Sequence, residues 1–389
     1  MMEHWIWLTT RQGLNKKTQY QLIRSFGDPK QVYDASCHEL QEVTSKGLEA
    51  LEEKDLTQAQ QILAKCRNKG IKLLTIADPQ YPQQLRGIWD PPLVLYYLGN
   101  LPDWNEKPVI GAVGTRSSSD YGLRAGEKLG YELSRGGAVV VSGMAEGVDA
   151  AVLKGVLSAD GTPVVFLAGG VDVVYPVANS GLYRSVLTQG CVLSEYPPGT
   201  KHQKWNFPQR NRLISGISQG VLVVEAPEKS GALITARHAL EQGREVYVVP
   251  SPIDQSSGRG SNALLKNGAT MAQEAWDILE HYQGSFQGLS KTCRNLEKQE
   301  NASENLPKAK KIIDNQGKQP YIDVEKKPVV HSPAEQAIID QLCLGPRLTD
   351  EIINDCGLAK QEALAVMTML EIRGLLRRLP GNLMTLNET

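Results

Sequence analysis

The chain has 389 residues, enough for two or three domains that each bury a core. Its 42 lysines and arginines against 43 aspartates and glutamates give a formal charge of -1, which excludes a generally basic surface. No apolar run approaches the ~20 residues that span a bilayer, and the N-terminus lacks signal-peptide features. The six scattered cysteines form no C-x-x-C pair, so we expect a cytoplasmic protein with reduced thiols and no zinc site.

Residues 1–70 predict a small helical domain. An apolar helical stripe ends at Gly27–Pro29, and Ala50–Cys66 shows a second, longer helical pattern. Residues 36–47 are similar to a helix-hairpin-helix, a motif whose glycine-rich turn can bind a DNA phosphate, although its first glycine is missing. DNA contact and a purely structural helical domain therefore both stay open for this part.

Residues 71–107 predict a connecting segment that contains one strand over Gly70–Thr75, and residues 108–283 predict a sheet domain. Short β-rich runs alternate with helical segments there, at Val109–Gly114, Ala138–Ser142, Val164–Ala168, Cys191–Ser194, Val221–Val224 and Val246–Val249. This alternation predicts an α/β fold with a doubly wound (extended Rossmann-like), mostly parallel sheet and helices on both faces. Such sheets bind ligands outside the carboxyl ends of their strands.

Residues 284–330 are polar and poor in apolar groups, so they predict a linker. Residues 331–389 predict a winged-helix domain, with helices starting near Ser332 and Thr349, a third over Ala359–Ile372, and a hairpin after it. The third helix offers few basic or amide groups for a major groove. Protein contact or domain packing therefore stays open for this domain beside DNA binding.

Residues Lys204–Ser215 hold the densest concentration of anion-binding groups in the chain. Asn206 is the predicted cap of a helix, and Pro208 suits its first turn. The helical period places Arg210 on the inward stripe, while Arg212 points elsewhere. An inward arginine at a helix start favours an anion as its partner. An arginine paired with a buried carboxylate is the alternative, and it stays open mainly for Arg210.

Turns rich in glycine and hydroxyl groups follow the predicted strands. In Gly111–Gly122, small residues allow backbone N–H groups and a helix dipole to face an anion, and Arg116 adds a forked donor. This turn is neither a Walker A loop nor the G-x-G-x-x-G of dinucleotide sites. In the next turn, Asp149 stands in a first helical turn, where a carboxylate is more often a dipole partner or the holder of an arginine than a general base.

The common enzyme classes are hard to build from these residues. The sequence has no Ser-His-Asp arrangement with a nucleophile elbow, no H-E-x-x-H and no acidic cluster for two Mg²⁺ ions. His202 stands beside Lys201 and Lys204, whose charges lower its pKa, so we interpret it as a rim residue and not as a catalyst. We expect no enzymatic activity and no cofactor.

Several motifs occur in order along the sheet domain: V-G-T-R at 113–116, S-G-M-A-E-G-V-D at 142–149, Y-P-x-x-N at 175–179, S-E-Y-P-P at 194–198, N-F-P-Q-R-N-R-L-I-S-G at 206–216, V-V-E-A at 223–226 and S-G-A-L-I-T-A at 230–236. The chain resembles the DNA-processing protein A family, also called DprA or Smf. The resemblance implies a non-enzymatic protein that binds single-stranded DNA during natural transformation, protects the incoming strand and helps load the RecA recombinase. It also implies a homodimer, with no membrane partner.

The resemblance assigns roles residue by residue. Arg116 corresponds to the family's phosphate-clamping arginine, and Lys204 and Phe207 correspond to its basic and aromatic pair. The full predicted DNA-binding set is Gly114, Thr115, Arg116, Ser117, Gly143, Lys204, Asn206, Phe207, Arg210, Arg212 and Thr235.

Two other functions compete with single-strand binding. A nucleotide hydrolase resembling the lysine-decarboxylase-like phosphoribohydrolases needs a P-G-G-x-G-T-x-x-E turn, and the sequence lacks it. A winged-helix regulator with a ligand-sensing sheet needs a more basic third helix.

Overall fold

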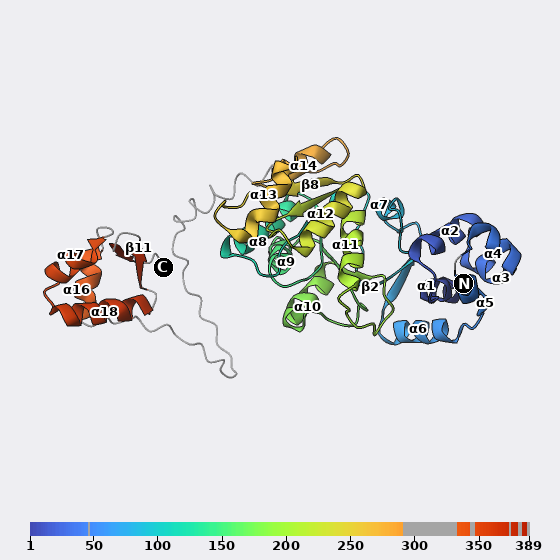
Figure 1. Ribbon diagram of the computed structural model, residues 1–389, viewed down its shortest axis with the longest axis horizontal. Coiled ribbons are helices and arrows are strands. Elements are labelled where there is room, and N and C mark those ends of the chain that lie inside the picture. Colours follow the sequence, from blue (N-terminus) through green and yellow to red (C-terminus); the bar gives the residue numbers. More distant parts are fainter. Residues whose placement is uncertain (46, 291–332, 343–346, 373–374, 380–382, 387–389) are drawn as a thin grey trace, which may run out of the picture. The chain divides into compact units, whose positions relative to one another are not determined.

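The computed structural model describes residues 1–45, 47–290, 333–342, 347–372, 375–379 and 383–386. The chain divides into two compact units, Met1–Pro307 and Lys308–Thr389. The first unit holds a helical N-terminal part and a sheet with its helices, and the second holds a small helical and stranded body (Figure 1). Most of the predicted linker lies outside the described residues.

The N-terminal part consists of short helices: α1 Met2–Thr10, α2 Lys16–Phe26, α3 Pro29–Asp34, α4 Cys37–Val43, α5 Leu48–Glu52 and α6 Thr57–Asn68. The single long helix predicted over Ala50–Cys66 is wrong, because the chain breaks between α5 and α6. There the Asp55 carboxylate accepts hydrogen bonds from the backbone N–H (2.8 Å) and the hydroxyl of Thr57 (2.6 Å) at the start of α6. Aspartate favours this local bond over a continuous helix.

Two ion pairs join the N-terminal helices to turns that follow sheet strands. Lys16 Nζ in α2 lies 3.4 Å from the Glu195 carboxylate, and Lys69 Nζ, directly after α6, lies 2.6 Å from the Asp172 carboxylate. The lysine side chains are partly exposed, whereas both carboxylates are largely buried. The helices are thus held against the edge of the sheet where ligands of this fold bind.

The main sheet has nine strands in the order β1-β2-β6-β5-β4-β3-β7-β8-β9. They are β1 Lys72–Thr75, β2 Val94–Gly99, β3 Val109–Val113, β4 Val139–Ser142, β5 Pro163–Phe166, β6 Cys191–Ser194, β7 Gly220–Val223, β8 Glu245–Val248 and β9 Thr270–Met271. Strands β3 to β9 run parallel, and β1 and β2 add an antiparallel edge. The segment predicted as a connection, 71–107, therefore also supplies two strands, of which β2 was not predicted.

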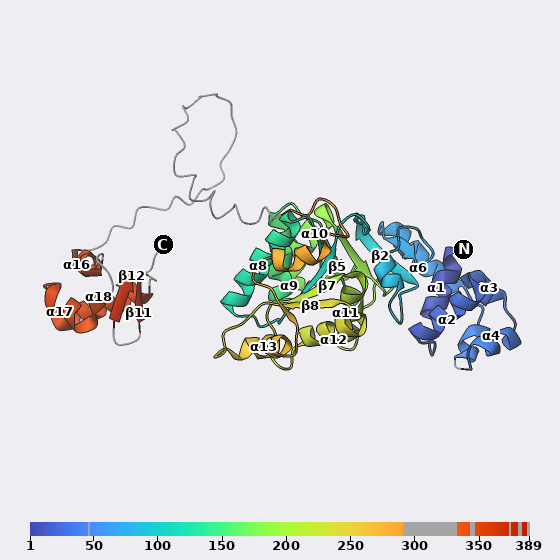
Figure 2. The same cartoon turned by 90° about the horizontal axis from the view of Figure 1, so that it is seen from above.

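Helices cover both faces of the sheet, which confirms the predicted doubly wound fold. On one face lie α8 Asp120–Arg135, α9 Val148–Ser158 and α10 Ser180–Gln189, and on the other lie α11 Asn206–Ile217 and α12 Gly231–Glu241 (Figure 2). The remaining elements are α7 Gln83–Arg86, η1 Val177–Asn179, η2 Ser256–Gly258, α13 Arg259–Lys266, α14 Trp276–Leu279 and η3 Glu280–Tyr282. Because α8 follows β3 on one face and α12 follows β7 on the other, the topological switch point lies between β3 and β7.

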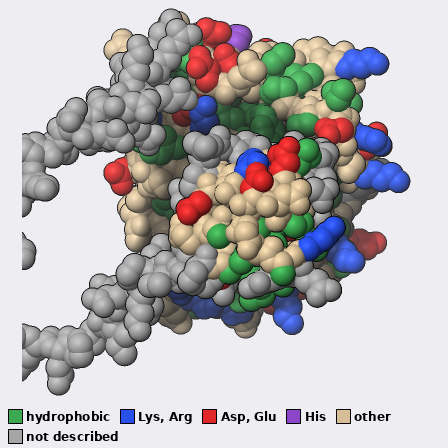
Figure 3. All heavy atoms as spheres, turned by 90° about the vertical axis from the view of Figure 1, so that its left-hand side faces the viewer, with side chains coloured by type: hydrophobic (Ala, Val, Ile, Leu, Met, Phe, Trp, Pro, Cys, Tyr) green, Lys and Arg blue, Asp and Glu red, His purple; other side chains and the backbone are tan. Residues whose placement is uncertain are grey.

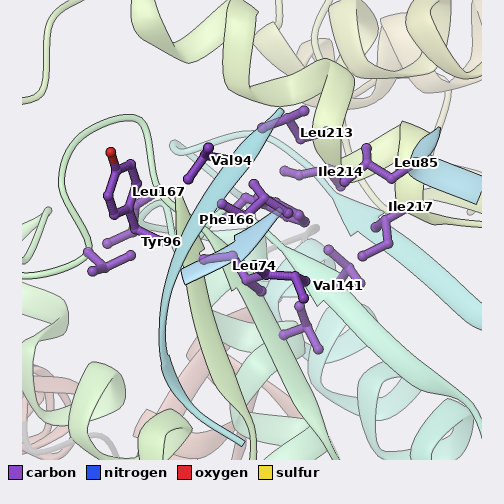
Figure 4. Close-up of a cluster of buried hydrophobic side chains, with 14 of the residues drawn as sticks. Leu74, Leu85, Val94, Tyr96, Val141, Phe166, Leu167, Leu213, Ile214 and Ile217 are labelled. Atoms are coloured by element: carbon purple, nitrogen blue, oxygen red, sulfur yellow. The ribbon is translucent and has the colours of Figure 1, made fainter. Parts of the chain in front are cut away.

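The main core includes the space between the sheet and the helices α7 and α11. Figure 4 shows Leu213, Ile214 and Ile217 of α11 grouped with Phe166 of β5 and Leu85 of α7, and all five are buried. Burying such a side chain contributes about 1.5–3 kcal/mol relative to leaving it exposed. The apolar stripe predicted for this helix is therefore confirmed, and it fixes the orientation of the polar residues at the start of α11.

On the opposite face, glycines let α8 and α9 pack closely. A Cβ on Gly155 of α9 would lie 1.9 Å from the Glu127 carbonyl oxygen, and one on Gly130 of α8 would lie 2.3 Å from that of Val152. Neither backbone atom can move away without displacing its helix. The close approach holds α8 in a fixed place, and with it the turn that leads from β3.

The second unit contains α16 Pro333–Leu342, β10 Arg347–Leu348, α17 Thr349–Asp355, α18 Lys360–Ile372, β11 Leu376–Leu379 and β12 Leu383–Leu386. Its strands pair in the order β10-β12-β11, and Ile338, Ile352, Met367 and Leu376 are among its buried residues. This is the predicted winged helix, with β10 as an unpredicted third strand. Ser332 lies outside the described residues, and the second helix starts at Thr349, where a helix start was predicted.

Charged side chains of both signs are mixed on the face drawn in Figure 3. On the face drawn in Figure 3, lysines and arginines lie scattered among acidic and apolar side chains. In the part of the chain that the structure describes, no helix is both long and apolar enough to cross a bilayer.

Candidate nucleic-acid interface

A cleft of about 310 Å³ opens at the carboxyl ends of β3 and β7, at the switch point of the sheet. Its walls are the turn Gly114–Ser117 after β3, the first turns of α11, and the segment from Pro227 to Thr235 that leads into α12. A smaller hollow of about 50 Å³ shares Arg116 and Phe207 with it. The sequence predicts a ligand site at this edge of the sheet, and the structure places a concave surface there.

One wall of the two hollows is a cluster of rings topped by a cation. The Arg116 guanidinium lies 4.8 Å from the centre of the Phe207 ring. The Tyr175 ring lies 5.6 Å from Phe207 and stacks on His202 at 5.0 Å, with 26° between the two planes. Arg116 and Tyr175 are exposed, and Phe207 and His202 are half-buried. The wall thus offers ring faces to solvent beside a positive charge.

His202 belongs to this ring wall. Its Nε2 lies 2.8 Å from the Val173 carbonyl oxygen. Burial lowers the pKa of His202, the hydrogen bond to Val173 opposes this, and the charge of Arg210 adds to the lowering. The predicted direction is confirmed, but the principal cause is burial and not the neighbouring lysines. His202 is therefore a neutral ring at neutral pH.

Asp149 and Arg210 form the buried floor of the cleft. The Asp149 carboxylate accepts hydrogen bonds from the backbone N–H groups of Gly114 (3.4 Å), Gly143 (3.2 Å) and Ala145 (3.3 Å). Arg210 Nη1 donates to the carbonyl oxygens of Gly143 (2.8 Å) and Phe166 (2.5 Å). The contacts of Asp149 tie together the turns after β3 and β4.

Glycine at position 143 is what lets Arg210 reach this place. A Cβ there would lie 2.2 Å from Arg210 Nη1. Burial raises the pKa of Asp149, against the opposing charge of Arg210, and burial lowers the pKa of Arg210 to about 10. Gly143 and Arg210, both in the predicted DNA-binding set, thus shape the site from beneath.

Arg212 makes the buried ion pair that the sequence leaves open as an alternative mainly for Arg210. Its Nη2 donates to the Glu195 carboxylate at 2.7 and 2.9 Å, and its Nε lies 3.2 Å from the Asp90 carboxylate. Arg212 was predicted to point away from the buried side, but only 5% of it is exposed. Its partners come from the turn after β6 and from the segment before β2, so the helical period of α11 could not reveal them.

The other predicted site residues divide between the cleft and its surroundings. Gly114, Thr115, Ser117 and Thr235 line the cleft. The Thr235 hydroxyl is buried and has no hydrogen-bond partner within the described part of the chain.

Asn206 and Lys204 lie next to the cleft and do not line it. The Asn206 side chain donates to the Ala168 carbonyl oxygen at 3.0 Å, which anchors α11 to the end of β5. Asn206 is therefore not the predicted cap, and the N-cap position belongs to Trp205. Lys204 is exposed and lies two residues before the start of α11.

Sequence reasoning missed three residues that line the two hollows: Tyr175, Asn211 and Lys229. The signal for Tyr175 was its place in the Y-P-x-x-N motif. The asparagine of that motif, Asn179, donates to the Met144 carbonyl oxygen at 3.0 Å and so joins the tyrosine loop to the turn after β4. Lys229 could have been found as a cation just before the hydroxyl- and glycine-rich start of α12.

The parallel sheet with a cleft at its switch point, together with the second unit, defines a Rossmann-like protein with an appended winged helix. A family model described as DNA recombination-mediator protein A matches residues 72–283, and one described as DprA winged helix domain matches residues 325–382. The chain belongs to this DprA/Smf family and is a DNA-processing protein.

Relatives and solved structures agree with this assignment. The chain is 35% identical to protein Smf of Synechocystis over 82% of its own length and 81% of that protein. It is 43% identical to the DNA processing protein DprA of Bacillus subtilis, over 56% of the chain and 74% of the relative. The structure of DprA from Streptococcus pneumoniae is similar with a TM-score of 0.65 and 30% identity, covering 72% of this chain and 98% of that one. DprA from Helicobacter pylori, whose structure is described as showing a single-stranded DNA binding mode, gives a TM-score of 0.50 at 27% identity, over 56% and 98% of the two chains.

Proposed function

We propose that this chain binds single-stranded DNA and catalyses no reaction on it. The observation that carries the proposal is the Arg116 guanidinium, 4.8 Å from the centre of the Phe207 ring at the mouth of the cleft. A sequence-tolerant single-strand binder needs phosphate donors beside an aromatic platform, because every base has a face that can stack. Arg116 and Phe207 provide both groups side by side.

The rest of the cleft supplies groups suited to a sugar–phosphate backbone. The exposed Lys229 adds a cation just before α12, and the exposed Ser117 adds a hydroxyl in the turn after β3. A base on the ring wall must be unstacked from its neighbours. This requirement favours a single strand over a duplex, in which the base faces are covered.

The family relationship supports a role in natural transformation. The model that matches the sheet domain is described as a recombination mediator, and the Helicobacter pylori relative is described as binding single-stranded DNA. We therefore propose that the chain acts in the cytoplasm, protects an incoming strand and helps load RecA recombinase. One cleft per subunit, in a chain of formal charge -1, favours a homodimer that holds one strand at two sites.

A titration of labelled single-stranded and duplex DNA at two salt concentrations tests the proposal. We expect the parent to prefer the single strand and Arg116→Ala to lose about tenfold or more of that affinity, because its charged hydrogen bonds to a phosphate, worth about 1.5–3 kcal/mol, are lost. Lys204→Ala should bind more weakly and reduce the log–log salt slope by about 0.7. Arg67→Ala, which removes an exposed arginine at the end of α6, should behave like the parent.

Equal affinity of the parent for both DNA forms would contradict the proposal, and so would unchanged binding by Arg116→Ala. Deletion of residues 332–389 serves as a further arm. If that deletion alone abolishes binding, the DNA site lies in the winged helix and the cleft is not responsible.

A further inference from the structure

Two tryptophans lie exposed outside the cleft, which is unusual for so large an apolar side chain. Trp205, directly before α11, is 69% exposed, and Trp89, in the segment between α7 and β2, is 74% exposed. Trp5, Trp7 and Trp104 are by contrast at most 4% exposed. Neither exposed ring belongs to the site described above.

The contacts of Arg212 bring the two tryptophans to one side of α11. Trp205 precedes Arg212 by seven positions, almost two helical turns, so both lie on the same face about 10.5 Å apart along the helix axis. Arg212 Nη1 donates to the Asp90 carbonyl oxygen at 2.8 Å, and Trp89 is the residue before Asp90. Figure 1 shows α7 beside α11 on the side of the N-terminal helices. The rings therefore follow one edge of α11, away from the cleft mouth.

The charges beside these rings are positive. Lys17 Nζ lies 4.1 Å from the centre of the Trp89 ring, and the exposed Lys204 precedes Trp205. The carboxylate of Asp90, the residue after Trp89, is paired with Arg212 at 3.2 Å. Lysines interleaved with exposed rings are the combination that binds a single strand through its phosphates and bases.

We infer that a single strand held in the cleft continues along this edge of α11, with one base stacked on Trp205 and a later one on Trp89. Lys17, Trp89, Lys204 and Trp205 form this second contact region, the tryptophan track. The inference rests on the proposed single-strand binding and extends it toward the N-terminal helices. The ammonium group of Lys17 moves from the Trp89 ring to a phosphate when a base takes its place.

The length dependence of binding tests the track. The full chain and the variant Trp89→Ala/Trp205→Ala are titrated with labelled oligo(dT) of about 6 and about 20 nucleotides, lengths that bracket one and several contact regions. Each ring should contribute about tenfold, so the variant should lose about a hundredfold in affinity for the long strand and nothing for the short one. Ile253→Ala, at a position 93% exposed on another loop, is the matched control.

A second variant, Trp89→Phe/Trp205→Phe, keeps the stacking faces and should retain most of the long-strand affinity. Unchanged affinity of the alanine variant for the long strand overturns the track, and so does an equal loss for both lengths. If the parent binds neither oligonucleotide, the proposed function itself fails, and this result is distinct from a failure of the track. Both rings are exposed, so the unfolding midpoint of the variants should match that of the parent.

Discussion

Replacing Arg212 with leucine is expected to lower the free energy of unfolding by about 3–5 kcal/mol, because the change leaves Glu195 buried without its principal partner. Glu195 is 7% exposed and, among the described residues, keeps only Lys16 as a cationic partner, at 3.4 Å, and Asp90 loses its ion pair with Arg212 as well. Chemical denaturation followed by circular dichroism measures the effect. Arg237→Leu, which removes an exposed partner of Glu241, should cost less than about 1 kcal/mol.

The pH dependence of this first variant has a defined sign. Burial acts to raise the pKa of Glu195, but the charges of Arg212 and Lys16 outweigh it and hold the pKa below its usual 4.5. A carboxyl with a lowered folded-state pKa adds stability above its unfolded-state pKa and loses it as the pH falls through the folded-state value. The difference between parent and Arg212→Leu should therefore be largest at neutral pH and shrink in acid. A constant difference would mean that packing, and not charge, is the contribution of Arg212.

Replacing Arg210 with methionine is expected to cost about 2–5 kcal/mol of stability and to weaken single-strand binding as well. The carbonyl groups of Gly143 and Phe166 lose their donor, and Asp149 loses the opposing charge beneath the cleft. Denaturation and DNA titration on the same samples measure both effects. Arg210→Lys keeps the charge without the forked geometry, so its stability and its DNA affinity should lie between those of the parent and of Arg210→Met. Full DNA affinity in the folded methionine variant would show that the floor does not support the binding surface.

Acid should reduce the stability cost of this second variant. Burial raises the pKa of Asp149 above its usual 3.8, Arg210 opposes this, and removal of Arg210 raises it further. A carboxyl with a raised folded-state pKa contributes stability that is complete below its unfolded-state pKa and is lost as the pH rises through the folded-state value. The free energy of unfolding of Arg210→Met should therefore be closest to that of the parent in acid, and the difference should grow as the pH rises and Asp149 ionises.

The sequence predicts the parts of the fold that depend on local pattern. The buried runs of β3 to β8 and the apolar stripe of α11 were read correctly, because hydrophobic periodicity is a local property. The long helix over Ala50–Cys66 and the missing β2 show the limit of this reasoning. The helical pattern over Ala50–Cys66 is interrupted where the Asp55 carboxylate accepts a hydrogen bond from the Thr57 backbone N–H. Strand β2 is stabilised by pairing with β6, a partner remote in sequence.

The candidate site shows the same division. Arg116 and Phe207 were predicted together, and the structure places the guanidinium of one over the ring of the other. The roles of Arg210 and Arg212 were not separable, because a helical wheel shows which face a residue occupies but not what covers that face. The Gly143 carbonyl in one case, and the segment before β2 in the other, decide the partner of each guanidinium.

The ion pairs of Lys16 with Glu195 and of Lys69 with Asp172 couple the stability of the N-terminal helices to the turns at the carboxyl ends of the strands. Glu195 follows β6 and Asp172 follows β5, so both anchors lie in turns at the same edge of the sheet as the cleft. A ligand that binds at these turns should suppress local opening of the helices linked to them. Any opening that releases the ligand must also overcome the free energy of binding. Amide hydrogens in α6 should then exchange more slowly in the bound protein, although neither proposed contact region includes a residue of this helix.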